Sequence, residues 1–212
     1  MLEINNLHLT RGKDKILNGV TFEIRINQII GIYGSISSGK TSMVEALFNF
    51  IPFDNGTVIF ENKKIAYNQP KHISKIRNKI GYVPQKDYFL QAGNILENIQ
   101  WIGRVSKDKA IELATYTEIS DILYSNIDNL SGSEKFRFKL TLALLKEPQL
   151  LFIDEPLTHI FPKYINDFTN LIDKISKHRK IGVLILSQYQ PLFENKIFTH
   201  LFKLEQGRLN GA

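Results

Sequence analysis

The 212-residue sequence contains no cysteine, two methionines and one tryptophan. The absence of cysteine excludes disulfide bonds, thiolate nucleophiles and cysteine-based zinc sites. No stretch of the sequence approaches the roughly 20 apolar residues that a membrane-spanning helix needs. The first six residues lack a basic segment followed by an apolar one, so no signal peptide is expected. We therefore expect a soluble, single-domain chain.

The sequence has a modest excess of positive charge. It contains 27 Lys and Arg against 21 Asp and Glu, a net charge of +6. The densest basic stretch has few aromatic residues between its charges, unlike a surface that stacks on bases; it comprises Lys63, Lys64, Lys71, Lys75, Arg77 and Lys79. A solvated face is the favoured interpretation, and nucleic acid is not expected as a partner.

Apolar patterning predicts strands that alternate with helices. Period-two alternation indicates strands at residues 2–7 and 20–24. Apolar residues at helical spacing predict helices at 40–50, 94–101, 107–116, 131–146 and 163–177. Continuous apolar runs predict fully buried strands at 29–33, 150–153 and 183–186. This order favours an α/β fold with a mainly parallel sheet, interrupted from residue 86 to 127 by a helical lobe.

The strongest motif runs from Gly34 to Thr41 and fits the pattern G-x-x-x-x-G-K-[ST]. It lies between a buried strand and an amphipathic helix, where backbone N–H groups converge on phosphate oxygens. Lys40 would contact the β- and γ-phosphates, and the Thr41 hydroxyl would ligate Mg²⁺. The alternative is a tight turn with a surface lysine. The candidate phosphate-binding residues are Gly34, Ser35, Ser37, Ser38, Gly39, Lys40, Thr41 and Ser42.

Two carboxylates follow the apolar run 150–153. Ligands bind at the carboxyl ends of parallel strands, which is where Asp154 and Glu155 stand. Asp154 is suited to hold Mg²⁺, and Glu155 to accept a proton from an attacking water. Taken alone, Asp-Glu-Pro after a strand is as often a simple turn.

Two shorter motifs complete an ordered set: Val83-Pro84-Gln85 and Leu130-Ser131-Gly132-Ser133-Glu134. In this order, the motifs resemble the nucleotide-binding domain of ATP-binding cassette (ABC) transporters over nearly the whole chain. The resemblance implies a P-loop NTPase fold, with an N-terminal antiparallel β subdomain and a short helical lobe. It also implies one domain, with a catalytic core at 1–85 and 148–212 and the lobe with its signature helix at 86–147.

The same resemblance implies a function and a set of partners. The chain would bind ATP and Mg²⁺ and hydrolyse ATP for a separately encoded transmembrane permease subunit. Gln85 would sense the metal and the water. Ser131, Gly132 and Ser133 would cap the nucleotide of the opposite subunit, in a homodimer or a heterodimer with another ABC ATPase. The expected location is cytoplasmic, peripheral on the cytoplasmic face of the inner or plasma membrane. Taken alone, 130–134 is better explained as an ordinary helix N-cap with an acidic first turn.

Residues 80–85 and 89–99 look like the exporter branch of the family. This resemblance implies a groove for the membrane subunit's coupling helix, with Tyr88, Phe89 and Leu90 as contact candidates. The alternative is that these side chains pack the lobe's own core.

Several positions depart from the family pattern. Ser37 replaces a glycine, which is tolerable if its backbone stays in a region open to L-residues. Arg11 stands where an aromatic residue normally stacks on adenine, and a guanidinium plane can also stack on a base. Ser133 and Glu134 replace glycine and glutamine, and the family segment before the signature is reduced between residues 124 and 130.

The third buried strand ends at Gln188, where the family has its switch histidine. An amide can donate a hydrogen bond to a γ-phosphate but cannot carry positive charge, so we expect slow hydrolysis. Phe161 takes the place of the aspartate that ends the loop after Pro156, and His159 is a weak candidate to replace the missing imidazole.

Two other functions stay open: a soluble ABC-type ATPase that acts on nucleic acid, and a nucleotide-gated regulatory subunit with little turnover.

Overall fold

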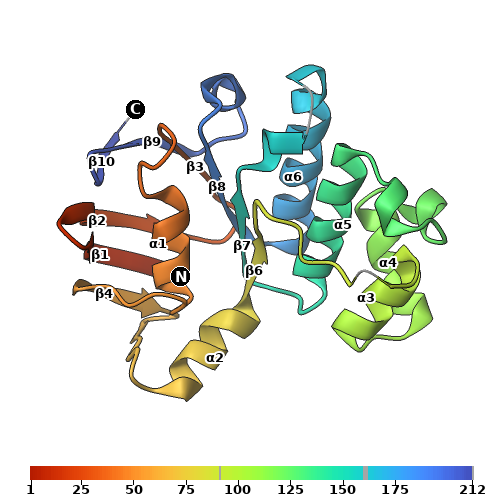
Figure 1. The fold of residues 1–212 in the computed structure, drawn as a ribbon, viewed down its shortest axis with the longest axis horizontal. Helices are drawn as coiled ribbons and strands as arrows, with labels where there is room; N and C mark the ends of the chain where they lie inside the picture. Colours follow the sequence, from red (N-terminus) through yellow and green to blue (C-terminus); the bar gives the residue numbers. More distant parts are fainter. Residues whose placement is uncertain (91, 160–161, 212) are drawn as a thin grey trace.

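The computed structural model describes residues 1–90, 92–159 and 162–211. Its strands form two sheets (Figure 1). The first is antiparallel with the strand order β2-β1-β4-β5. Its strands are β1 (Leu2–Arg11), β2 (Asp14–Ile24), β4 (Asn55–Phe60) and β5 (Lys63–Lys64).

The second sheet carries the predicted buried strands and has the order β10-β9-β3-β8-β7-β6. Strands β9, β3, β8, β7 and β6 are mutually parallel, and β10 forms an antiparallel hairpin with β9. The strands are β3 (Ile29–Tyr33), β6 (Ile80–Val83), β7 (Leu150–Asp154), β8 (Gly182–Ser187), β9 (His200–Glu205) and β10 (Arg208–Gly211). The predicted, mainly parallel sheet is thus confirmed.

Helices pack on both faces of the parallel-rich sheet, and the helices of the lobe lie to one side of it. Helix α1 lies between the two sheets, α5 and α6 lie on the other face, and α3 and α4 lie farthest from the antiparallel sheet (Figure 1). The helices are α1 (Lys40–Leu47), α2 (Pro70–Lys79), α3 (Ile95–Gly103), α4 (Lys107–Tyr116), α5 (Gly132–Leu144) and α6 (Ile165–Arg179).

Two hydrophobic clusters fill the interior. One joins the antiparallel sheet and α1 to one face of the parallel strands, through residues such as Phe22, Met43 and Phe152. The other joins the opposite face of those strands to α6 and to the lobe helices, through residues such as Ile99 and Val183. The division into a catalytic core at 1–85 and 148–212 and a lobe at 86–147 stays a prediction. Buried side chains of the lobe belong to the same hydrophobic cluster as those on one face of the parallel strands.

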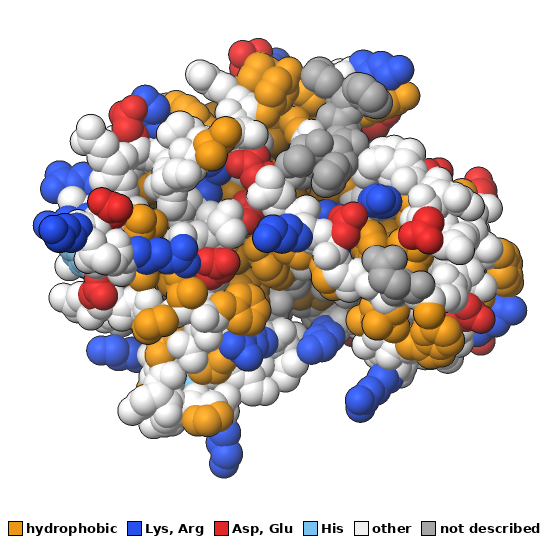
Figure 2. All heavy atoms as spheres, viewed as in Figure 1, with side chains coloured by type: hydrophobic (Ala, Val, Ile, Leu, Met, Phe, Trp, Pro, Cys, Tyr) orange, Lys and Arg blue, Asp and Glu red, His pale blue; other side chains and the backbone are white. Residues whose placement is uncertain are grey.

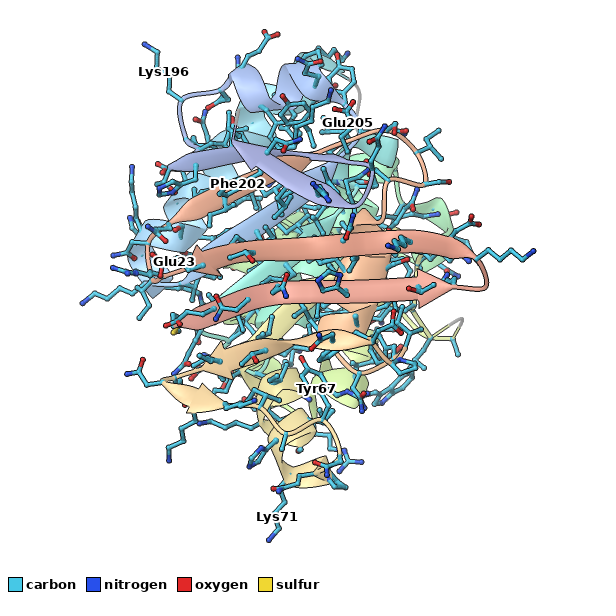
Figure 3. All side chains as sticks on the ribbon, turned by 90° about the vertical axis from the view of Figure 1, so that its left-hand side faces the viewer. Glu23, Tyr67, Lys71, Lys196, Phe202 and Glu205 are labelled. Carbon is cyan, nitrogen blue, oxygen red and sulfur yellow. The ribbon has the colours of Figure 1, made fainter. Side chains whose placement is uncertain are left out.

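Helix α2 was not predicted from the sequence, because its many cations suggested only a solvated face. Pro70 fills its first turn, a position that needs no backbone N–H. Ile73 and Ile76 are three residues apart and both are buried, which fixes one face of the helix on the core. Lys71 extends away from the helix into solvent (Figure 3). The solvated-face interpretation therefore holds for the outer side of a packed helix.

Among the described residues, no helix is long and apolar enough to cross a membrane.

Candidate functional site

The loop between β3 and α1 wraps around the Lys40 ammonium. Lys40 is 5% exposed, and its Nζ donates to the carbonyl oxygens of Gly34 (2.9 Å) and Ser35 (3.0 Å) and to Ser38 Oγ (3.4 Å). Its Nζ also lies 3.4 Å from Glu155 Oε1. The ammonium is therefore held inside the loop by oxygens, and phosphate oxygens can replace these partners at the same place.

Two glycines of the loop are required by its shape. A Cβ on Gly34 would lie 2.5 Å from the Leu204 carbonyl oxygen, and Gly39 has a left-handed φ of 104°. Ser37 also has a positive φ, 63°. The sequence predicts that Ser37 is tolerated if its backbone stays in a region open to L-residues. Ser37 instead adopts the left-handed conformation that favours glycine. Such a conformation costs an L-residue about 1–2 kcal/mol.

Asp154 and Thr41 form the part of the site that is suited to a divalent cation. Thr41 Oγ1 donates to Asp154 Oδ2 at 2.8 Å, and the Tyr82 hydroxyl lies 3.4 Å from the same oxygen. Asp154 is 1% exposed, and its Oδ1 has no hydrogen-bond partner among the described residues. Burial raises the pKa of Asp154 above its usual range, although the Thr41 hydrogen bond opposes this shift.

An orphaned carboxylate oxygen beside a hydroxyl fits Mg²⁺, which binds proteins through few oxygen ligands and keeps phosphate and water oxygens. Among the described residues, no group of three or more His, Cys, Asp or Glu side chains gathers as a self-sufficient metal site. Asp154 and Thr41 would hold the ion, which when bound neutralises charge on the β- and γ-phosphates.

Glu155 follows β7 in a constrained conformation. Its φ is 48°, and its backbone N–H donates to the Leu186 carbonyl at 2.8 Å. Its Oε2 accepts hydrogen bonds from Ser187 Oγ and from the Gln188 backbone N–H, both at 3.0 Å. Together with the Lys40 pair, these contacts orient the carboxylate toward the phosphate loop. A carboxylate in this place can polarise a water for attack on a γ-phosphate.

Most of the predicted site residues surround one cavity of about 440 Å³. It is lined by Arg11, Ile16, Ile36, Ser37, Ser38, Gly39, Lys40, Thr41, Ser42, Gln85, Glu155 and Gln188. The ends of β3, β6, β7 and β8 lie at the same edge of the parallel sheet, which is why residues far apart in sequence meet there.

The predicted signature residues Ser131, Gly132 and Ser133 are not among those that line this cavity. Ser131 caps α5: its Oγ accepts from the Glu134 N–H at 3.4 Å, and its own N–H donates to Glu134 Oε2 at 2.7 Å. Ser131 and Glu134 therefore form a capping box, in which the side chain of each residue accepts a hydrogen bond from the backbone N–H of the other. Phe161 lies outside the described residues, and the His159 side chain is also not described.

Arg11 lies at the edge of the cavity. Its Nη2 pairs with Glu45 Oε2 at 3.2 Å, and its side chain is 53% exposed. Ile16 and Ile36 also line the cavity and were not predicted from the sequence. Ile36 occupies a position of the phosphate-loop motif that any residue type can fill, and Ile16 lies outside every motif. Ser187 and Tyr82, whose hydroxyls contact Glu155 and Asp154, were also not predicted from the sequence.

A phosphate loop, a buried aspartate that accepts a hydrogen bond from Thr41, and a carboxylate at the sheet edge define a P-loop nucleoside triphosphatase of the α/β class. The family model of ABC transporters matches residues 17–158, more than half of the chain. The chain belongs to this family and carries its ATPase domain, which binds ATP with Mg²⁺.

Known relatives cover nearly all of the chain. It is 26% identical to the phosphonates import ATP-binding protein PhnC of Treponema denticola, over 99% of this chain and 88% of that protein. It is 27% identical to the lipoprotein-releasing system ATP-binding protein LolD of Rickettsia felis, over 97% of this chain and 94% of that protein. Its fold matches the dimeric post-hydrolysis structure of the ATP-binding cassette MJ0796 bound to ADP and Pi, with a TM-score of 0.86 and 20% identity, over 99% of this chain and 97% of that one.

Proposed function

We propose that this chain hydrolyses ATP at the Lys40 cavity and drives a separately encoded membrane permease. The observation that carries the proposal is the meeting of the Lys40 loop, Gln85 and Glu155 around one cavity, next to the hydrogen-bonded pair of Thr41 and the buried Asp154. Lys40 binds the β- and γ-phosphates, Thr41 and Asp154 hold Mg²⁺, and Glu155 activates water. Gln85 contacts the Mg²⁺ ion and the attacking water, and Gln188 contacts the γ-phosphate.

Two nucleotides are sandwiched between two such chains, either two copies of this one or this chain and another ABC ATPase. The N-terminus of α5 is not among the cavity-lining residues of its own chain, so Ser131, Gly132 and Ser133 are available to a partner's nucleotide. A helix N-terminus favours a γ-phosphate. The MJ0796 cassette, whose fold this chain shares, is a dimer with ADP and Pi.

The permease contact lies on a groove of about 400 Å³ between the core and the lobe. Tyr88, Ile102 and Leu145 contribute apolar surface to it, with Arg77 and Lys146 also lining it. The Phe89 ring instead stacks on Phe138 of α5, with 4.7 Å between the ring centroids. Tyr88 therefore fits the expected contact with the permease, whereas Phe89 fits the alternative of packing in the lobe's own core. The permease places the chain peripherally on the cytoplasmic face of the inner or plasma membrane, where ATP is available.

The direction of transport is export. This rests on the resemblance of residues 80–85 and 89–99 to exporters, whereas the relatives named above include both an import and a release system. An ATPase that acts on nucleic acid is disfavoured, since positive and negative side chains are interspersed over the face shown in Figure 2. A gated subunit with little turnover is favoured by the residue types Gln188 and Phe161 and disfavoured by Glu155.

The site is tested by Lys40→Ala. The variant should lose measurable ATP binding in calorimetry with Mg²⁺, because one ammonium and its charge-assisted contacts are removed from the phosphate position. Lys64→Ala, on the exposed strand β5, is the matched control and should bind ATP as the wild-type chain does. An ATP affinity unchanged in Lys40→Ala would refute the assignment. Single-turnover hydrolysis by the wild-type chain separates an ATPase from a gated subunit.

A further inference from the structure

Lys139 is a buried cation inside the lobe that the nucleotide site does not directly use. It lies in α5, where its neighbours Phe136, Phe138 and Leu140 are buried apolar residues. Lys139 itself is 3% exposed. Burial lowers its pKa, and the nearby Asp87 carboxylate opposes this shift. A cation in such a place costs free energy unless its donors are paired.

The donors of Lys139 are paired with the loop that carries Gln85. Its Nζ donates to the carbonyl oxygens of Pro84 (3.0 Å) and Gln85 (3.2 Å) and lies 3.2 Å from Asp87 Oδ1. An ammonium has three N–H donors, and three acceptors surround this one. In return, the Tyr88 hydroxyl donates to the Lys139 carbonyl at 3.4 Å. The side chain is therefore a multipoint connection between α5 and residues 84–88.

This connection joins two parts of the nucleotide machinery. Gln85 lines the Lys40 cavity, and α5 begins just after Ser131, which caps the helix. Lys139 lies eight residues, or about 12 Å, along the helix from Ser131. A helix that is capped at one end and bonded to the Gln85 loop farther along holds the Gln85 backbone at a fixed place relative to the capped end.

We infer that Lys139 is a positioning residue that fixes the Gln85 loop relative to the α5 helix and so sets the place of the Gln85 side chain. The inference rests on the proposed role of Gln85 in hydrolysis. An aliphatic residue at position 139 would pack among the neighbouring apolar side chains but would leave two loop carbonyls without their donor. The buried charge thus supplies geometry at a cost in burial energy.

Lys139→Met tests this in the full-length chain, because methionine keeps the length of the side chain and removes the ammonium. We expect ATP affinity within twofold of wild type, since the Lys40 loop is untouched. Turnover should fall about tenfold, the size of effect usual when an outer partner of a ligand is removed. Lys135→Met is the matched control: Lys135 lies one turn earlier on α5 and 3.9 Å from Asp87 Oδ2, and its turnover should stay within twofold.

A double-mutant cycle separates positioning from a general structural effect. In a Gln85→Ala background, Lys139→Met should cause no further loss of turnover, because the group it positions is gone. A tenfold loss that persists in that background, or wild-type turnover in Lys139→Met alone, would overturn the inference. If Lys139→Met does not fold, Asp87→Asn replaces it in the same cycle with the same expectations. Failure of the wild-type chain to bind ATP would instead refute the proposed function, and this inference with it.

Discussion

Replacing Gln188 by histidine measures what an imidazole would contribute directly after β8, where the sequence resemblance implies a histidine. The structure makes this a clean change. The Gln188 side chain is exposed at the cavity, whereas its backbone N–H holds Glu155 Oε2 at 3.0 Å. A side-chain substitution leaves that backbone hydrogen bond in place. Differences in turnover among variants at this position therefore report on the side chain toward the γ-phosphate.

The expected gain follows from the electrostatics of one preorganised partner. Removing such a group from an active site commonly costs on the order of 100-fold in turnover. Glutamine keeps a donor but no charge, so we expect Gln188→His to raise kcat by about 10–100-fold, or about 1.4–2.7 kcal/mol of barrier. Gln188→Ala should lower kcat by about tenfold relative to wild type, which is the share left to a neutral hydrogen bond.

Phosphate release under single-turnover conditions, with saturating ATP and Mg²⁺, measures these effects without interference from product release. The advantage of Gln188→His over wild type should be larger below about pH 6.5, where imidazole carries charge, and should shrink above it. The ratio of Gln188→Ala to wild type should not change over the same range. Equal kcat values for all three chains would remove the side chain at position 188 from the mechanism.

Two further predictions concern stability. Phe152→Ala, in the centre of β7, should lower the free energy of unfolding by about 3–5 kcal/mol in urea titrations, because the ring is fully buried against Phe48; a loss under 1 kcal/mol would contradict the packing. The Glu61–Lys75 hydrogen bond lowers the pKa of Glu61. Its stabilisation, about 0.5 kcal/mol, should be present above the unfolded pKa near 4.3 and be lost as pH falls through the folded pKa. Unfolding of Lys75→Met and wild type should therefore differ at pH 7 and converge in acid, and a constant difference would contradict the pairing.

The parts of the fold that were predicted have strong local patterns. Strands β3, β7 and β8 are short continuous apolar runs, and each is followed by a polar motif at the sheet edge. The meeting of Lys40, Asp154 and Glu155 follows from that edge and from the parallel pairing of the strands. Helix α2 was missed because two isoleucines among many cations are a weak signal in the sequence. In the structure, the burial of those isoleucines against the core holds the helix in place.

The missed contacts share a different cause. Ser187 and Tyr82 matter through side chains that lie far from them in sequence, Glu155 and Asp154, and no local pattern identifies a hydroxyl that bonds across a sheet. Lys139 is the extreme case, because a lysine within an amphipathic helix is normally assigned to the solvated face. Its burial becomes intelligible once the Gln85 loop is packed against α5, since only then do two carbonyls and a carboxylate surround the ammonium. Sequence patterns therefore place the groups that we propose to bind phosphate, whereas the groups that set their geometry depend on the packing of the lobe against the core.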